Sequence, residues 1–390
     1  MKNFVSENIK FVFKTEMHSG DGIARDLSKH LKNNSWSKIG LVIDKGLYEN
    51  SAYVKEIIET CKKELERVVL FISIMPEPTY DYLDTAKSAF IGNELDCFVG
   101  IGGGSTLDLT KGLATLYTNP GEAIQYRGFG KVKNIPLPVV ALPSTAGTGS
   151  EVTPYAVFID TVAKWKFGIN TEYNYPRLAL YDPKFLDSCP MKVFASAGMD
   201  AMTHTLESFV AKNATFMSRM FSLQAFSLLF VNLKKLSQGD CSCQVKLSLL
   251  LGSGCAGAAL MNSGAGPAGA LSYPLGVYFD IPHGLAGSVF LPGVIQHNVD
   301  KGYYDYAQLH DLVFEEAGLS HKEKSVIFAS EIKKLSSDLG IPTDLKGFGV
   351  KTESDLKLII DNSMQLKAAF DQNPVLFDNE EISRLIYSLK

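Results

Sequence analysis

From about residue 38 the chain alternates short apolar runs with amphipathic stretches of helical period, and this alternation restricts the fold more than any other feature. Residues 39–44 and 68–74 have the apolar composition of strands buried on both faces, and residues 51–65 between them have a helical pattern. A strand, a helix and a strand in this order predict a βαβ unit and a parallel sheet. Loops at the carboxyl edge of such a sheet are where open α/β folds bind ligands.

The pattern changes after residue 182, where long helical periodicities replace the strand patterns. Residues 192–211 and 218–236 are the clearest of these helical stretches, and further ones continue to the end of the chain. We therefore expect two domains, an α/β domain over residues 1–185 and an all-helical domain over residues 186–390.

Composition excludes several classes of protein. The formal net charge of -4 provides no basic field for a polyanion, so we expect no nucleic-acid partner. No run of roughly 18 apolar residues predicts a membrane span, and the amino terminus lacks the apolar core of a secretory signal. The six cysteines are scattered, as is typical of reduced thiols. These features predict a cytoplasmic protein that binds its ligands at local sites.

A glycine-rich loop lies between a predicted strand and a predicted helix. Gly102, Gly103, Gly104 and Ser105 occupy this position, where bare backbone amides and a helix amino terminus attract phosphate. The spacing differs from the G-x-G-x-x-G of a standard Rossmann motif, and a tight strand-to-helix turn would explain the same residues. The loop therefore predicts either a pyrophosphate site or a simple turn.

A second loop and one carboxylate strengthen the nucleotide interpretation. Thr145, Thr148 and Ser150 supply hydroxyls directly after another predicted strand. Asp44 ends the first strand of the alternating region, where a carboxylate accepts hydrogen bonds from ribose hydroxyls and repels a 2′-phosphate. This position favours NAD over NADP as the cofactor of a dinucleotide-binding α/β domain, although an aspartate that begins a turn is equally consistent with the local sequence.

The helical region contains a candidate metal site. Asp200 and His204 are four residues apart in a helical stretch, so both project from one face, and His283 adds an imidazole in a loop beside a proline and a glycine. Such pairs also serve as surface or capping interactions, and a lone histidine is often structural. A metal held here would polarise an alcohol or carbonyl oxygen while a nicotinamide carries the hydride.

Together these motifs resemble the iron-containing, or group III, alcohol dehydrogenases over nearly the whole chain from about residue 35. The segments that carry the resemblance are GGGSTLDLTK (102–111), ALPSTAGTGSEVTP (141–154), KFGI (166–169), SAGMDAMTHTLE (196–207) and PLGVYFDIPHGLAGSVFLP (274–292). The resemblance implies a dehydroquinate-synthase-like fold, with the active site in a cleft between the two domains. It also implies a homodimer or a larger homo-oligomer.

The resemblance further implies roles for individual residues. The residues expected to bind the cofactor are Asp44, Gly103, Gly104, Ser105, Asp108, Ser144, Thr145, Thr148, Val157 and Lys166. The expected metal ligands are Asp200, His204 and His283, and the expected catalytic residues are Tyr273, Asp108 and His283.

Three positions depart from the family's pattern. Gly269 stands where the family usually has a third histidine ligand, and Tyr273 stands where it has a histidine close to the nicotinamide. Glu77 replaces the usual asparagine of a segment near the adenosine. Three ligands can still hold Fe²⁺ or Zn²⁺ with lower affinity, because catalytic zinc often has only three protein ligands. Alternatively the protein works without metal, and Tyr273 supplies the proton.

We therefore expect an NAD(P)-dependent dehydrogenase or reductase that interconverts a small primary alcohol and an aldehyde, with a polyol or sugar-derived compound as one substrate class. The alternatives are a metal-independent reductase of the same fold and a catalytically inactive nucleotide-binding homologue. A lyase like dehydroquinate synthase shares the architecture but needs more basic residues for an acidic substrate. The sequence identifies neither the substrate nor the direction of the reaction.

Overall fold

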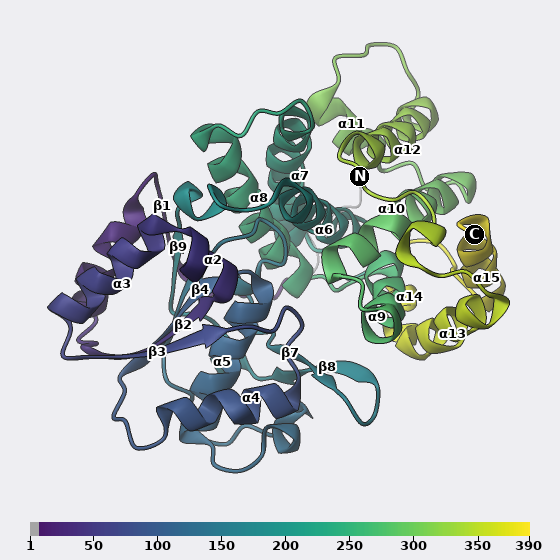
Figure 1. The fold of residues 1–390 in the computed structure, drawn as a ribbon. Coiled ribbons are helices and arrows are strands. Elements are labelled where there is room, and N and C mark those ends of the chain that lie inside the picture. The colour runs from purple at the N-terminus through teal and green to yellow at the C-terminus, as the bar shows by residue number, and fades with distance from the viewer. Residues whose placement is uncertain (1–7) are drawn as a thin grey trace. The chain divides into compact units, whose positions relative to one another are not determined.

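The computed structural model describes residues 8–390, and the chain divides into two compact units (Figure 1). One unit is Phe13–Pro190, and the other consists of Met191–Lys390 together with the described residues before Phe13. We expected the division near residue 186 and the whole amino terminus on the α/β side. The segment before Phe13 instead joins the helices, because the backbone of Val12 exchanges hydrogen bonds with the side-chain amide of Asn262.

The α/β unit is built on a six-stranded parallel sheet, as the sequence predicts. Its strands, in spatial order, are β1 (Glu16–Ser19), β9 (Leu178–Tyr181), β6 (Val139–Pro143), β4 (Cys97–Gly102), β2 (Lys38–Asp44) and β3 (Arg67–Ser73). The helices of this unit are α1 (Leu27–Asn33), α2 (Lys45–Asn50), α3 (Ala52–Glu64), α4 (Tyr80–Lys87) and α5 (Gly104–Thr118).

Helices cover both faces of this sheet, which explains the apolar runs of the strands. On β2, Ile39, Leu41 and Ile43 pack into a core shared with α1 and α3. Val42, on the opposite face, packs with Phe98 of β4 into a core shared with α4 and α5. The alternating direction of side chains along a strand therefore serves two cores at once.

The order of the strands creates a switch point between β2 and β4. The chain leaves β2, passes through α3 and enters β3 on one side, and it then returns through α4 to β4 on the other side of β2. Asp44 and Gly102 end these two neighbouring strands. In open α/β sheets the crevice at such a switch point is the usual place for a ligand.

A second, smaller sheet was not predicted from the sequence. It contains β5 (Gly128–Phe129), β8 (Trp165–Asn170) and β7 (Val157–Asp160), with β7 and β8 antiparallel. A parallel bridge between Thr79 and Ile159 joins it to the segment that follows β3. Strands this short give little periodic signal, which is why the pattern of hydrophobic residues misses them.

The second unit is helical throughout its described residues, as predicted. Its helices are α6 (Met191–Val210), α7 (Phe216–Ser237), α8 (Cys243–Met261), α9 (Pro267–Phe279), α10 (His283–Asp300), α11 (Ala307–Val313), α12 (His321–Asp338), α13 (Glu353–Ser363), α14 (Lys367–Asp371) and α15 (Asn379–Ser388). By length and composition α7 and α8 could cross a bilayer, but they pack on each other and on α6, as core helices of soluble proteins do. The absence of a membrane span stays a prediction.

Candidate functional site

The two glycine-rich segments follow neighbouring strands of the parallel sheet and meet at its carboxyl edge. Gly103 caps the amino end of α5, which begins at Gly104 directly after β4. The backbone amide of Ser144, which follows β6, donates a hydrogen bond of 2.9 Å to the carbonyl oxygen of Gly102. The structure therefore brings the two predicted cofactor loops together.

Glycine is required in the first loop because the second loop lies so close to it. A Cβ atom built on Gly104 would lie 2.6 Å from Oγ1 of Thr148, and one on Gly103 would lie 3.2 Å from Oγ1 of Thr145. The result is a surface of bare backbone and hydroxyl groups at the amino terminus of a helix. Such a surface is suited to a pyrophosphate, because helix amino termini attract anions.

Asp108 anchors the second loop to α5. Its two carboxylate oxygens accept hydrogen bonds from Ser150 Oγ at 2.5 Å and from the amide of Val157 at 3.0 Å. Lys111, which is fully buried, donates to Ser150 Oγ and to the carbonyl of Tyr155 at 2.6 and 2.7 Å. Burial raises the pKa of Asp108, and the nearby Lys111 ammonium opposes this rise. These contacts position the loop; the expected roles of Asp108 in cofactor binding and catalysis stay predictions.

Ser105 and Lys166, both expected to bind the cofactor, make contacts with the segment after β3. The hydroxyl of Ser105 donates to the carbonyl of Pro76. Nζ of Lys166, on β8, lies 2.7 Å from Oε2 of Glu77. The residue that replaces the family's asparagine therefore forms an ion pair with the expected ribose-binding lysine.

Asp44 caps a short helix that the sequence did not predict. Its Oδ1 accepts a 3.0 Å hydrogen bond from the amide of Leu47 at the beginning of α2. A side-chain cap of this kind is the ordinary role of an aspartate before a helix. Asp44 ends β2 at the same sheet edge as the glycine loops, and its contact with a ribose stays a prediction.

The three predicted metal ligands lie together in the helical unit. Asp200 and His204 project from the same face of α6, and His283 is the first residue of α10. One ligand atom of each lies within 4.8 Å of the others. We expected His283 in a loop; it instead begins the helix, because the left-handed Asp280 ends α9 and Pro282 occupies the capping position of α10.

The spacing of these groups fits a divalent cation better than a hydrogen-bonded cluster. Nε2 of His204 and Nε2 of His283 each lie 3.8 Å from Oδ1 of Asp200, which is too far for a hydrogen bond. Ligands bound at about 2.0–2.2 Å around a tetrahedral ion lie about 3.4 Å apart. The side chains of Asp200 and His204 are 5% and 11% exposed. A buried carboxylate facing two imidazoles in this way is the donor set of an iron or zinc site.

Comparisons with known proteins agree with both halves of this description. Residues 14–183 match the family of iron-containing alcohol dehydrogenases, and residues 194–389 match the C-terminal domain of the Fe-containing alcohol dehydrogenase family. The chain belongs to the iron-containing alcohol dehydrogenase family.

The similarity to known relatives and solved structures covers nearly the whole chain. The chain is 31% identical over 347 residues to 1,3-propanediol dehydrogenase from Klebsiella pneumoniae, covering 88% of this chain and 89% of the relative. It is 28% identical to the NAD-dependent methanol dehydrogenase of Bacillus methanolicus, with 94% and 96% covered. A crystal structure of a 1,3-propanediol oxidoreductase superimposes with a TM-score of 0.92 at 29% identity, covering 98% of this chain and all of that one.

Membership in the iron-containing alcohol dehydrogenases confirms three predictions from the sequence. The fold is that of a dehydroquinate-synthase-like protein, with a parallel α/β unit and a helical unit. The protein is an oxidoreductase that acts on CH–OH groups and uses a nicotinamide cofactor.

Gly269 stands where the iron-containing alcohol dehydrogenases usually have a histidine, and the carboxylate of Glu207 lies next to it. Gly269 lies on α9, and its amide donates a 3.1 Å hydrogen bond to Glu207, whose other oxygen accepts from the amide of Gly266 at 2.9 Å. A Cβ atom on Gly269 would lie 3.1 Å from Oε2 of Glu207. Burial raises the pKa of Glu207, and these two amides oppose the rise.

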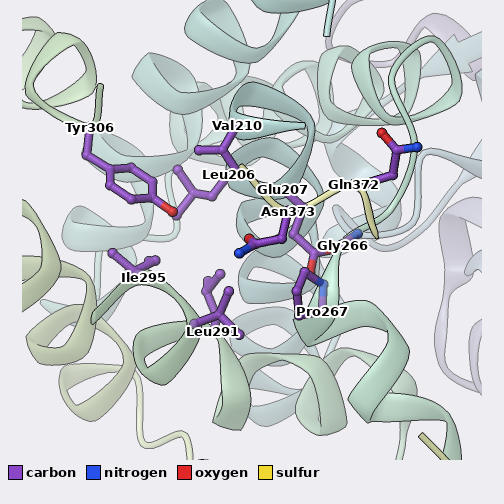
Figure 2. Close-up of a pocket in the computed structure, with 11 residues that line it drawn as sticks. Leu206, Glu207, Val210, Gly266, Pro267, Leu291, Ile295, Tyr306, Gln372 and Asn373 are labelled. Atoms are coloured by element: carbon purple, nitrogen blue, oxygen red, sulfur yellow. The ribbon is translucent and has the colours of Figure 1, made fainter. Parts of the chain in front are cut away.

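Glu207 also lines a small cavity of the helical unit (Figure 2). The cavity has a volume of about 10 Å³, room for roughly one water molecule. In Figure 2 the side chain of Glu207 lies next to Gly266 and Pro267 on one side, and Tyr306 lies across from it. The cavity is too small for a substrate.

Tyr273, which stands where the family has a histidine, lies over His283, one of the expected metal ligands. Its ring is stacked on that of His283, with centroids 5.8 Å apart and planes inclined by 28°. The hydroxyl group of Ser272, the preceding residue, lies 3.1 Å from Nδ1 of His283. The structure thus places Tyr273 beside the predicted metal site, and its role as a proton donor stays a prediction.

Sequence reasoning missed Ser272, Glu207 and the pairing of Glu77 with Lys166. Glu207 could have been found from the sequence, because its spacing from Asp200 and His204 places all three side chains on one face of α6. Ser272 and Glu77 contact partners that are remote in sequence or lie across a turn, so no local pattern marks them.

Proposed function

We propose that this protein is a metal-assisted, NAD-dependent dehydrogenase that interconverts a small primary alcohol and its aldehyde. The convergence of Asp200, His204 and His283 within 4.8 Å is the observation that carries the proposal. Family membership and the paired glycine loops support the cofactor, and the carboxylate Asp44 supports NAD rather than NADP.

Each unit supplies one part of the chemistry. A divalent cation held by the three ligands would act as a Lewis acid on the oxygen of the substrate, and NAD would accept or deliver the hydride. The protein's own residues orient these groups: Ser272 fixes the ring of His283, and the Asp108–Lys111 pair holds the second cofactor loop. The ring of Tyr273 covers His283 and limits the space beside it.

The substrate class rests on the relatives. The two relatives reported above are named for 1,3-propanediol and methanol, and a relative from Escherichia coli is a lactaldehyde reductase. We infer a small alcohol or aldehyde as the substrate, with a homodimer or larger homo-oligomer as the working assembly in the cytoplasm. Turnover of C2 to C4 diols and aldehydes, followed through NADH absorbance, tests the substrate class.

Metal analysis tests the proposal directly. The purified protein is expected to contain close to one equivalent of iron or zinc, and chelation is expected to remove both metal and turnover. His204→Ala is expected to lose metal while keeping NADH binding, because its ring faces Asp200 and His283 in the helical unit, whereas the glycine loops belong to the α/β unit. Full turnover in metal-free protein contradicts the proposal.

A second function is favoured by the stacking of Tyr273 on His283. In a metal-independent reductase of the same fold, the phenolic hydroxyl would deliver a proton to the oxygen of the reduced substrate. Tyr273→Phe separates the two functions. If Tyr273 donates the proton, this variant should abolish turnover in metal-free protein. If a metal ion assists the reaction instead, the variant should leave metal-dependent turnover largely intact. A protein with neither activity that still binds NADH would be an inactive nucleotide-binding homologue.

A further inference from the structure

The first turn of α10 lies very close to α6, on which α10 packs in the helical unit (Figure 1). A Cβ atom built on Gly284, the second residue of α10, would lie 2.7 Å from the carbonyl oxygen of Ser196 and 3.2 Å from Cβ of Asp200. Cβ atoms essentially never have contacts shorter than 3.0 Å. Only glycine therefore allows the two helices to approach each other this closely.

The obstacle to a side chain at Gly284 is backbone, which cannot rotate out of the way. The carbonyl of Ser196 belongs to the hydrogen-bonded backbone of α6, one turn before Asp200. Backbone strain does not explain the glycine, because Gly284 is not among the residues with a positive φ, and alanine could adopt its conformation. Glycine also makes a helix less stable than alanine does. The close approach of α6 is therefore what favours glycine at this position.

This close approach is confined to the amino end of α10. Gly287 also faces α6, but a Cβ atom there would lie 3.8 Å from Cγ2 of Thr203, which is an ordinary contact. A Cβ atom on Gly293, further along the helix, would meet the side chain of Leu385 on α15 instead. Among the glycines of α10, Gly284 alone lies against the backbone of α6, directly beside the expected metal ligands.

We propose that Gly284 is a positioning residue of the metal site. It sets the distance between α10 and α6, and with it the 3.8 Å between Nε2 of His283 and Oδ1 of Asp200. An alanine would have to retreat from 2.7 Å to the 3.4 Å at which ordinary contacts begin, so the helices would move apart by roughly 0.7 Å. Metal–ligand distances are defined to within about 0.2 Å, so a bound ion does not tolerate this movement. The inference rests on the proposed metal-assisted function.

Gly284→Ala tests the proposal in the full-length protein. Bound metal is removed with a chelator, and zinc affinity is then measured by competition with a chromophoric chelator, independently of turnover. We expect the variant to bind zinc about 10- to 100-fold more weakly than the parent, the range typical when a ligating histidine loses its support. The absorption bands of Co²⁺ bound in place of zinc should also change, because they report the coordination geometry. A glycine with a merely structural role would leave these bands unchanged.

Two other glycines of α10 provide matched controls. Gly287→Ala adds the same methyl group to the face of α10 that packs on α6, but it creates no close contact, so zinc affinity should stay the same. Gly293→Ala brings a Cβ atom within 2.3 Å of Cδ1 of Leu385, away from the metal ligands. This variant should lower the melting temperature without changing zinc affinity in the folded protein.

A longer carboxylate at Asp200 provides a second test. Asp200→Glu extends this ligand by one methylene group, which should weaken zinc binding at the parent's helix spacing. In Gly284→Ala the longer side chain spans part of the added separation, so the same change should cost less affinity. Independent effects of the two substitutions would contradict the proposal. In variants that fold less stably, the rise in melting temperature on adding zinc gives the same comparison, because its size depends on the dissociation constant.

The outcomes separate this inference from the function on which it rests. If the parent protein binds neither iron nor zinc, the proposed function and this inference both fail. If the parent binds zinc and the folded Gly284→Ala protein binds it equally tightly, the inference alone is overturned. If Gly284→Ala loses zinc affinity but the metal-free parent keeps full turnover, the positioning role of Gly284 is supported and the metal-assisted function is contradicted.

Discussion

The hydroxyl oxygen of Ser272 lies 3.1 Å from Nδ1 of His283. The same hydroxyl donates its hydrogen to the carbonyl oxygen of Gly269 at 2.6 Å, so it must accept from the imidazole. Nδ1 of His283 therefore carries a hydrogen, which leaves Nε2, the nitrogen that faces Asp200, as the atom that can bind a metal. This is the tautomer that a metal ligand needs, and the serine fixes it before any ion binds.

Replacing Ser272 by alanine should weaken metal binding. Loss of a hydrogen-bond partner behind a ligating histidine typically lowers metal affinity by about 10- to 100-fold, and we expect this range for Ser272→Ala. Competition with a chromophoric zinc chelator measures the affinity independently of turnover. Ser288→Ala is the matched control, because Ser288 is a buried serine of α10 whose hydroxyl bonds only to carbonyls of its own helix. Equal affinities in the two variants would show that packing alone orients His283.

Introducing a histidine at Gly269 should restore a fourth protein ligand. Its Cβ atom would lie 3.1 Å from Oε2 of Glu207, so the carboxylate has to shift by a few tenths of an ångström. We expect Gly269→His to bind zinc or iron at least about tenfold more tightly than the parent, because a further ligand completes the metal's coordination shell.

The control for this gain is Gly269→Ala. It introduces the same close contact with Glu207 but supplies no ligand atom. Metal affinity should rise only in the histidine variant, and stability should fall in both. If neither variant changes the metal content, Gly269 does not face the ion held by Asp200 and His204, and the resemblance misleads at this position.

The sequence predicted those parts of the fold and the site whose residues are linked by local periodicity. Strand β2 was predictable because burial on both faces leaves one uninterrupted apolar run. Asp200 and His204 were predictable as a pair because their spacing fixes them on one face of a helix. The meeting of the two glycine loops followed from the general rule that loops after parallel strands lie at the carboxyl edge of the sheet.

Other contacts depend on packing between segments that no local pattern links. Lys166 and Glu77 are 89 residues apart, and their pairing requires the small sheet that the sequence did not reveal. The contact between Ser272 and His283 depends on the left-handed backbone of Asp280, which a non-glycine residue seldom adopts. Both pairs could be recognised only after the backbone was known.

Lys111 should be among the most sensitive positions of the α/β unit. Its fully buried ammonium group bonds to Ser150 and Tyr155 and lies 3.6 Å from Asp108. Removing one partner of a buried ion pair typically costs about 3–5 kcal/mol, because the other charge is left without compensation, and we expect this loss for Lys111→Met. Calorimetry of the unfolding transition of this unit measures the effect.

A double variant shows whether the loss of stability in Lys111→Met comes from the carboxylate of Asp108, which stays buried without its counter-charge. Adding Asp108→Asn to Lys111→Met removes that charge, so the double variant should be less destabilised than the sum of the two single variants. Both single variants should also weaken NADH binding, because the second cofactor loop loses its anchor to α5. Strict additivity would mean that Asp108 and Lys111 act independently.

Glu151 should make the α/β unit less stable as the pH rises toward neutrality. It is buried, and burial raises the pKa of its carboxyl group from 4.5 to about 7, while the hydroxyl of Tyr181 at 3.1 Å and the Lys111 ammonium partly oppose the rise. Between these two pH values the unfolded chain releases this proton and the folded chain keeps it. Unfolding is therefore favoured progressively, by roughly 3 kcal/mol once the pH is above 7, at about 1.4 kcal/mol for each pH unit.

Glu151→Gln isolates this effect because glutamine stays neutral at every pH and keeps a similar shape. Below about pH 4.5 the parent and the variant should differ little in their free energy of unfolding, since both side chains are then uncharged in the folded and the unfolded chain. The advantage of the variant should grow from pH 4.5 to 7 and then stay constant. Denaturant titrations of the two proteins at a series of pH values measure this difference directly. A difference that does not vary with pH would mean that the pKa of Glu151 is the same in the folded and the unfolded chain.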